Sequence, residues 1–288
     1  MASGKASLYD PGLSLAPTLR KAAVHDSTHS LARTLGRFAA ETRSESLPPL
    51  ALERAKMIVA STLASASRGI DIASVQAIRR LEHSLSPNGG PCALWLTPGS
   101  LPPDRAARVN AVASDAAASD DSDLRSIAHI GTPATAAALA VGPWRGCSGR
   151  DLLAAIVLGY EIAGRVDEPL TPGRMQRGFH GSVSTIFAAT VVAGRLIGLR
   201  AEPMAHALSI AASSACGMAI AADTSCAREY HAGLAAMLGV QAALAAEAGF
   251  ESELAVLDAP RGFFDAFNGQ AVETVGADLG QSWDIVTD

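Results

Sequence analysis

The chain has 288 residues, 49% hydrophobic and 18% charged, a balance typical of a globular protein that can bury a large core. Its net charge of −5 and the absence of a basic run argue against nucleic-acid binding, which needs a clustered cationic face. No apolar segment of about twenty residues lacks charges, and the N-terminus lacks a signal-peptide core, so we expect neither a membrane span nor export. Four cysteines without a CxxC pair favour a reduced, cytoplasmic protein with no disulfide framework and no structural zinc site.

Helical patterns follow one another along most of the chain. Residues 1–29 are predicted to form a flexible or loosely docked extension, and residues 30–288 a single helical domain. Gly and Pro bracket one short strand-like run at 92–97. The predicted helices cover 30–43, 48–69, 71–85, 102–123, 131–141, 148–166, 182–199, 201–220 and 228–250, with shorter helical pieces after them. The predicted fold class is therefore all-α, a multi-helix bundle.

The segment 228–250 has almost no polar face over four turns. A helix of this kind must be covered on most sides, either at the centre of the domain or in a subunit interface. We therefore expect a homo-oligomer, most simply a homodimer.

Three histidines stand beside glycine or at helix entries, namely His129, His180 and His231. His129 precedes the helix expected to begin near Thr132, whose free backbone N–H groups would attract an anion. His180 lies between glycines before another helix, whose dipole favours the neutral imidazole that a general base requires. For His129 and His180, the alternative is a loop histidine that is hydrogen-bonded to backbone or caps a helix.

Arg228 and His231 are three residues apart and can share one helix face. Arginine grips carboxylates in a bidentate manner, although a surface pair with Glu229 is the simpler interpretation. The histidines and cysteines lack metal-ligand spacing, so we expect no metal. No P-loop, dinucleotide fingerprint, GxSxG elbow or HExxH motif is present.

Several segments together resemble the helical domain of the MmgE/PrpD family, from about residue 30 to the C-terminus. The most specific are "GYEIAGR", "GFH" and "HAGLAAMLGVQAALAAEAGF". The family includes 2-methylcitrate dehydratase, cis-aconitate decarboxylase and iminodisuccinate epimerase. The resemblance implies a dimeric, cofactor-free protein that moves protons on small polycarboxylates. It also implies a pocket between the helical domain and a smaller α/β domain.

The resemblance assigns roles to particular residues. His180 matches the catalytic histidine of "GFH", and His129 matches the histidine before the proline-started helix, with a small shift in loop length. Ser122 falls where the family has the threonine of "DFDDT", and Asp120 and Asp121 keep two acids of that motif. We expect His180 and His129 to be catalytic, and Ser122 and Asp121 to bind substrate.

The chain also departs from the family pattern. Ala118 aligns with the first acid of "DFDDT", and Arg228 aligns with a lysine. Arginine does not titrate near neutrality, so Arg228 is expected to bind substrate charge beside His231 and to transfer no proton. The sequence ends at "SWDIVTD", before the next family lysine and the second domain.

The sequence thus predicts a cofactor-free lyase or isomerase acting on a small molecule that carries a carboxylate or carbonyl, in a biosynthetic pathway for example. Dehydration, decarboxylation, epimerisation and cyclisation all involve the proton transfer that His180 and His129 would perform. One alternative is a subunit that is completed by a separately encoded partner domain. Another is a non-catalytic binding protein on the same scaffold.

Overall fold

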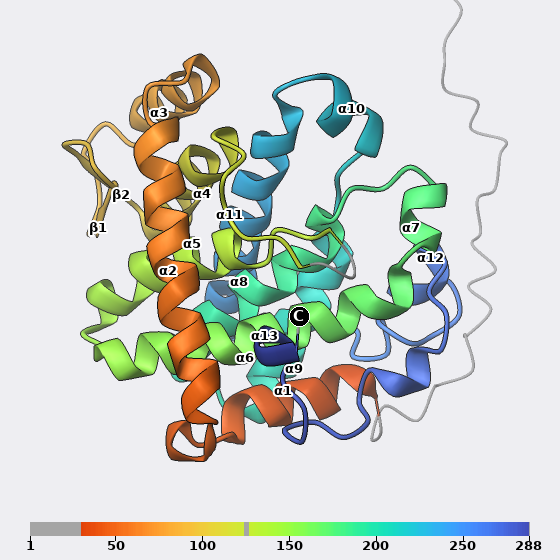
Figure 1. Cartoon of the computed structure of the whole chain (residues 1–288). Coiled ribbons are helices and arrows are strands. Elements are labelled where there is room, and N and C mark those ends of the chain that lie inside the picture. The colour runs from red at the N-terminus through yellow and green to blue at the C-terminus, as the bar shows by residue number, and fades with distance from the viewer. Residues whose placement is uncertain (1–29, 124–126, 288) are drawn as a thin grey trace, which may run out of the picture.

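The computed structural model describes residues 30–123 and 127–287, and Figure 1 shows helices joined by short loops, with one small hairpin. The α-helices are α1 (Leu31–Glu41), α2 (Pro49–Gly69), α3 (Ala73–Leu85), α4 (Pro103–Ala116), α5 (Gly131–Arg145), α6 (Gly149–Asp167), α7 (Gly173–Gln176), α8 (Ser182–Leu196), α9 (Ala201–Ser214), α10 (Ala219–Thr224), α11 (Ala227–Glu247), α12 (Phe263–Ala266) and α13 (Asp284–Thr287). Short 3-10 helices are η2 (Ser44–Ser46), η3 (Glu168–Leu170) and η4 (Val272–Thr274). The all-α prediction is confirmed.

The strand-like run predicted at 92–97 forms half of a hairpin. Strand β1 (Cys92–Ala93) pairs antiparallel with β2 (Ser100–Leu101), and Cys92 lies opposite Leu101. The strand is shorter than predicted because Leu96 has a positive φ of 55°, which turns the backbone out of the extended conformation.

Helix boundaries follow local signals at several places. Helix α2 begins at Pro49 and ends at Gly69, as the sequence predicts. Before α6, the hydroxyl of Ser148 accepts a hydrogen bond from the Asp151 N–H, and the Asp151 carboxylate accepts one from the Ser148 N–H. This reciprocal capping box fixes the start of α6.

Helix α8 lies at the centre of the core. It packs against α5, α6, α9 and α11, and every residue from Ser182 to Leu196 except Arg195 is buried. Two glycines allow this packing: a Cβ at Gly159 of α6 would lie 2.8 Å from the Ala188 carbonyl oxygen, and one at Gly239 of α11 would lie 2.6 Å from the Ala189 Cβ. The small residues thus let the three helix backbones approach closely.

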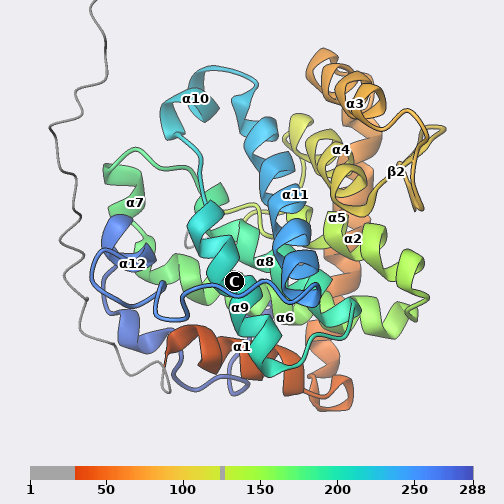
Figure 2. The same ribbon diagram turned by 180° about the vertical axis from the view of Figure 1, so that it is seen from behind.

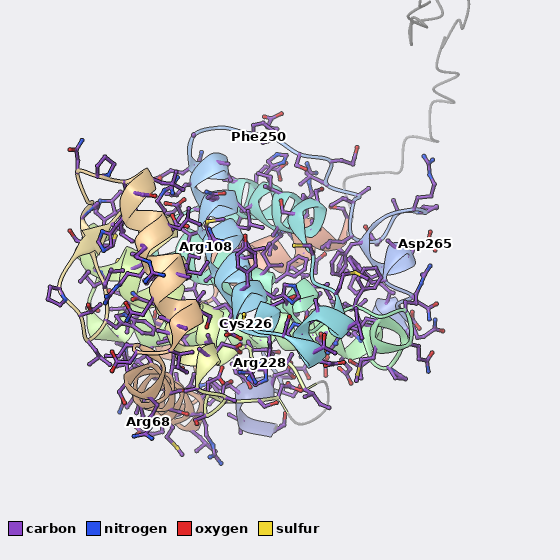
Figure 3. The ribbon with its side chains drawn as sticks, turned by 90° about the horizontal axis from the view of Figure 1, so that it is seen from above. Arg68, Arg108, Cys226, Arg228, Phe250 and Asp265 are labelled. Carbon is purple, nitrogen blue, oxygen red and sulfur yellow. The ribbon has the colours of Figure 1, made fainter. Side chains whose placement is uncertain are left out.

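Neighbouring helices provide part of the cover predicted for 228–250. Helix α11 packs against α4, α5, α8, α9 and α10. Figure 1 shows α2 on the near face, and Figure 2 shows α11 on the opposite face, with α5 and α8 between them. Figure 3 shows Arg228 at one end of α11 and Phe250 beyond its other end.

The segment predicted as one helix at 201–220 is divided into α9 and α10, so this prediction is wrong at residues 215–218. The break contains Gly217, whose φ of +141° is unfavourable for other residues. Its carbonyl oxygen accepts a hydrogen bond from the His180 N–H at 3.0 Å, so the break is part of the candidate site.

The extension predicted at residues 1–29 lies outside the described residues. Within the described part of the chain, no helix combines the length and the apolar character needed to cross a membrane.

Candidate functional site

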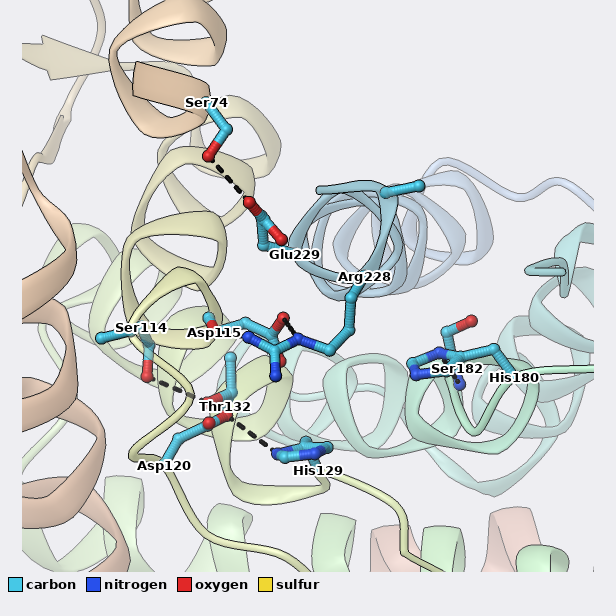
Figure 4. A network of polar contacts seen from close by, with 12 residues as sticks. Ser74, Ser114, Asp115, Asp120, His129, Thr132, His180, Ser182, Arg228 and Glu229 are labelled. Atoms are coloured by element: carbon cyan, nitrogen blue, oxygen red, sulfur yellow. Dashed lines mark hydrogen bonds and ion pairs between the residues drawn. The ribbon is translucent and has the colours of Figure 1, made fainter. Parts of the chain in front are cut away.

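The candidate site lies where α4 ends and where α5, α8 and α11 begin (Figure 4). Asp115 comes from the last turn of α4, and His129 from the loop before α5. His180 precedes α8, and Arg228 belongs to the first turn of α11. Three helix N-termini thus meet at this place, and each contributes a partial positive charge.

The backbone around His180 is held by pairing with the break after α9. The His180 N–H donates to the Gly217 carbonyl, and the Ala219 N–H donates to the Gly178 carbonyl at 2.9 Å. Gly178 has a φ of +81°, which explains the requirement for glycine at that position. The next residue, Phe179, packs edge-to-face on Phe267 with 4.7 Å between ring centroids.

The imidazole of His180 is held in one tautomer. The Ser182 N–H donates to Nδ1 of His180 over 3.3 Å, so the neutral ring carries its proton on Nε2. Burial, followed by the positive charges of His231 and Arg174, lowers the pKa of His180 to about 4. The ring is therefore neutral at pH 7 and presents Nε2–H as a hydrogen-bond donor.

His231 lies beside this ring. The two ring centroids are 5.5 Å apart, and burial lowers the pKa of His231 as well. Nδ1 of His231 is buried without a hydrogen-bond partner. A Cβ at Gly217 would lie 3.4 Å from this nitrogen and 3.5 Å from the His180 Cβ, so Gly217 sits between the two histidines.

A buried ion pair supports the His180 loop from behind. Arg174 donates from Nε to Asp167 Oδ1 at 3.1 Å and from Nη2 to Oδ2 at 3.2 Å. The Ser184 hydroxyl also donates to Oδ1, and the Arg174 carbonyl accepts from the Phe179 N–H. Asp167 is completely buried, so this network fixes α7 and the loop against the start of α8.

His129 has the opposite electrostatic environment. Its Nδ1 lies 3.3 Å from Oδ2 of Asp120, a carboxylate with no exposed side-chain surface, and the contact is an ion pair rather than an aligned hydrogen bond. Burial alone would lower the pKa of His129, but Asp120 and two further aspartates outweigh it and raise the pKa to about 8. The ring is therefore largely cationic at pH 7. The Thr132 hydroxyl also donates to Oδ2 of Asp120, at 2.7 Å.

The N-terminus of α5 is occupied by a carboxylate of the chain itself. Oδ2 of Asp121 accepts a hydrogen bond from the Gly131 N–H at 3.0 Å. Burial, followed by the charge of Asp120, raises the pKa of Asp121 to about 7. The sequence placed the cap of this helix at Thr132, but the helix begins at Gly131, and the capping carboxylate comes from ten residues earlier, between α4 and α5.

Arg228 also has a partner within the chain. Its Nε donates to Oδ2 of Asp115 at 3.1 Å, and its Nη2 donates to the Asp115 carbonyl at 2.5 Å. Asp115 is almost fully buried, and burial followed by the charge of Asp120 raises the pKa of its carboxyl to about 6. The Arg228 guanidinium is thus already paired with a carboxylate.

The structure therefore brings together most of the residues proposed from sequence. His180 and His231 form one group, and Asp121 lies near Asp120. His129 and Arg228 lie beside Asp120 and Asp115 (Figure 4). Ser122 is exposed.

Asp115 was missed by the sequence reasoning. The available signal was a single acid in the otherwise apolar stretch "AVASDAAA", where a buried charge requires a partner. Oxygen or nitrogen atoms of Asp115, Asp120 and His129 lie within 4.8 Å of one another, so these side chains offer ligands for a divalent cation. Arg228 and Thr132 already donate to the two carboxylates.

The helical fold and the polar cluster at its converging helix ends define the class of protein as an all-α domain with a histidine- and aspartate-rich site. Residues 33–274 match the family model described as the MmgE/PrpD N-terminal domain. The chain belongs to the MmgE/PrpD family.

The curated relatives include cis-aconitate decarboxylase of Aspergillus terreus and the protein of the same name from its strain NIH 2624 / FGSC A1156. Each is 29% identical to this chain over an alignment of 188 positions that covers 63% of this chain and 38% of the relative. The match therefore spans about two fifths of the length of these relatives. The family thus contains lyases.

Proposed function

We propose that this chain is a cofactor-independent lyase or isomerase that transfers a proton at a C–H bond next to a carbonyl or carboxylate. The observation that carries the proposal is that two histidine pKa values are shifted in opposite directions from their ordinary value. The pKa of His129 is raised to about 8, and the pKa of His180 is lowered to about 4. Titratable groups whose environments separate their pKa values in this way mark acid and base assignments in active sites.

His129 and Asp120 form the proton-transfer pair of this proposal. The carboxylate faces Nδ1, which favours a proton there and leaves Nε2 as the nitrogen that exchanges protons with substrate. A pKa of about 8 lies near neutrality, where an imidazole can serve as acid in one step and as base in another.

His180 is the neutral hydrogen-bond donor of this proposal. The Ser182 N–H occupies Nδ1, so the resting ring cannot accept a proton at Nε2 without changing tautomer. Its Nε2–H can instead stabilise negative charge that develops on a carbonyl or carboxylate oxygen as the C–H proton leaves. This assignment differs from the expectation from sequence that His180 transfers a proton together with His129.

Dehydration, decarboxylation and epimerisation all use an enolate-like intermediate of this kind. Because relatives of this chain are named cis-aconitate decarboxylase, decarboxylation is one of the reactions to be tested. The environments of the two histidines support the step that these reactions share, which is proton transfer at an acidic carbon.

The test compares variants of the two histidines. Candidate substrates are small oxo acids, unsaturated acids and cis-aconitate, and the assay follows deuterium incorporation and product formation by proton NMR in D2O. We expect His129→Gln to lower the rate by about 10²–10⁴-fold. We expect His180→Gln, which keeps an N–H donor, to lose about tenfold or less, and His180→Phe to lose about 10²–10³-fold.

His206→Gln is the matched control, because His206 contacts Ser252 outside the site. If His180→Gln loses as much as His129→Gln, then His180 is the base and the assignment is reversed. If His129→Gln, His180→Gln and His180→Phe all keep the full rate on a substrate that the wild-type protein converts, the proposed function is wrong.

A further inference from the structure

A groove separate from the candidate site lies between α3, α4 and the start of α11. It has a volume of about 370 Å³, and Figures 1 and 2 both show α4 between α3 and α11. Its walls are mostly apolar, and they include Ala77 and Ile78 of α3 and Val112 of α4. The described residues that line it include none of the histidines and aspartates of the candidate site, and they do not include Arg228.

The charged side chain among these described lining residues is Glu229. Although it belongs to the first turn of α11, Glu229 is only 7% exposed. Its Oε1 accepts a hydrogen bond from the Ser74 hydroxyl at 2.7 Å (Figure 4). In the part of the chain that the structure describes, no other donor contacts this carboxylate, and no cationic side chain forms an ion pair with it.

Neighbouring arginines on α4 and α11 are engaged with other acids. Arg228 pairs with Asp115, so the pair with Glu229 considered from sequence is not formed. Arg108 of α4 pairs with Glu82 at 2.5 Å. A carboxylate is costly to bury without a cation, because desolvation is compensated only by a charged or hydrogen-bonding partner. Glu229 thus brings uncompensated negative charge to an apolar groove.

Two polar neighbours in the groove also suit a cation. The Ser74 hydroxyl donates to Glu229 and keeps lone pairs that can accept from an ammonium group. Tyr230 lines the groove and is 41% exposed, and the face of an aromatic ring attracts positive charge. The ring already has one cation beside it, because the Arg108 Cζ lies 4.8 Å from its centroid.

From the buried carboxylate and the apolar walls around it we infer that this groove binds a small organic cation, a primary ammonium group on an apolar body. The ammonium group donates to Glu229 and Ser74, and the hydrocarbon packs on Ile78 and Val112. The volume of about 370 Å³ lies within the range of small-molecule pockets. An anionic ligand of the same shape would meet the like charge of Glu229 at short range. Binding here is independent of the proposed proton transfer.

Three probes of matched shape and different charge test this inference. They are cyclohexylamine, which is a cation at pH 7, cyclohexanol, which is neutral, and cyclohexanecarboxylate, which is an anion. Titrations followed by proton–nitrogen NMR give the affinity and the location from backbone amide shifts. Wild-type protein should bind cyclohexylamine about tenfold or more tightly than cyclohexanol, and cyclohexanecarboxylate most weakly. The largest shifts should fall on α3 and on the first turn of α11.

Glu229→Gln separates charge from shape, because its amide oxygen can still accept from the Ser74 hydroxyl. It should weaken cyclohexylamine binding about tenfold or more and change cyclohexanol binding by about threefold or less. Ala77→Phe places a ring in the groove and should weaken the binding of both ligands. Glu247→Gln is the matched control, because Glu247 pairs with Arg145 near the other end of α11 and lies outside the groove. It should bind all three probes as wild type does.

The inference is overturned if wild-type protein binds cyclohexanol as tightly as cyclohexylamine, or binds neither at millimolar concentration. It is also overturned if folded Glu229→Gln keeps the wild-type affinity for cyclohexylamine. Shifts centred on Asp115 and Asp121 would show that the cation binds at the acids of the candidate site, which would likewise refute a site in the groove.

Discussion

The carboxylate of Asp120 should control the charge of His129. In the wild-type protein, burial lowers the pKa of His129, and its nearest carboxylate at 3.3 Å is the foremost influence raising it to about 8. Asp120→Asn keeps the shape of the side chain and removes the charge, while the burial remains. We expect the pKa of His129 to fall from about 8 to its ordinary value of about 6.5 or below.

The size of this effect follows from the shift. A decrease of about 1.5 pH units corresponds to about 2 kcal/mol of differential interaction with the charged ring. The side chain of His129 is 21% exposed, so solvent screening reduces this figure only in part. The same substitution removes a charge that raises the pKa of Asp121, so the pKa of that carboxyl should decrease as well.

The assay is a pH titration of the histidine rings by long-range proton–nitrogen NMR, with the His129 signals assigned from a His129→Gln variant. Glu202→Gln is the control, because Glu202 lies 4.0 Å from the ring of His206 at another site and should leave His129 unchanged. A wild-type pKa below 6.5, or a value that Asp120→Asn does not lower, would refute this account of the site.

The same pair predicts a stability change with pH. A pKa raised on folding adds stability that is present below the unfolded value of about 6.5 and is lost as the pH rises through about 8. Urea unfolding of wild-type protein should therefore lose about 1 kcal/mol between pH 7 and 9 from this group, and Asp120→Asn should lack that loss.

Two further predictions concern the surroundings of the site. The pKa of His180 is lowered to about 4, so its neutral state contributes stability that is present above pH 6.5 and is lost as the pH falls through 4. Chemical unfolding of wild-type protein should therefore give a lower stability at pH 4 than at pH 7. In His180→Gln, this decrease should be smaller by up to about 3 kcal/mol. Arg174→Met leaves Asp167 buried without its cation and should destabilise the fold by about 3–5 kcal/mol. Arg145→Met breaks the more exposed ion pair with Glu247 and should destabilise it by about 1 kcal/mol or less. Equal losses of stability in thermal unfolding would contradict this ranking.

The sequence by itself determined the features that depend on neighbours within a few residues. The Ser148–Asp151 capping box, the start of α2 at Pro49 and the burial of the small-residue helices were predictable, because caps act over three residues and helical periodicity is local. Glycine beside His180 was also a readable signal, and Gly178 does adopt a positive φ.

Tertiary structure decided the electrostatics of the candidate site. Asp115 and Arg228 are 113 residues apart, and Asp121 caps a helix ten residues away in place of the local Thr132. The pKa values of His129 and His180 move in opposite directions because buried carboxylates favour the charged form of one ring, whereas burial and then neighbouring positive charges disfavour the charged form of the other. Charge interactions and burial depend on distance in space, and only the packing of α4, α5, α8 and α11 sets those distances.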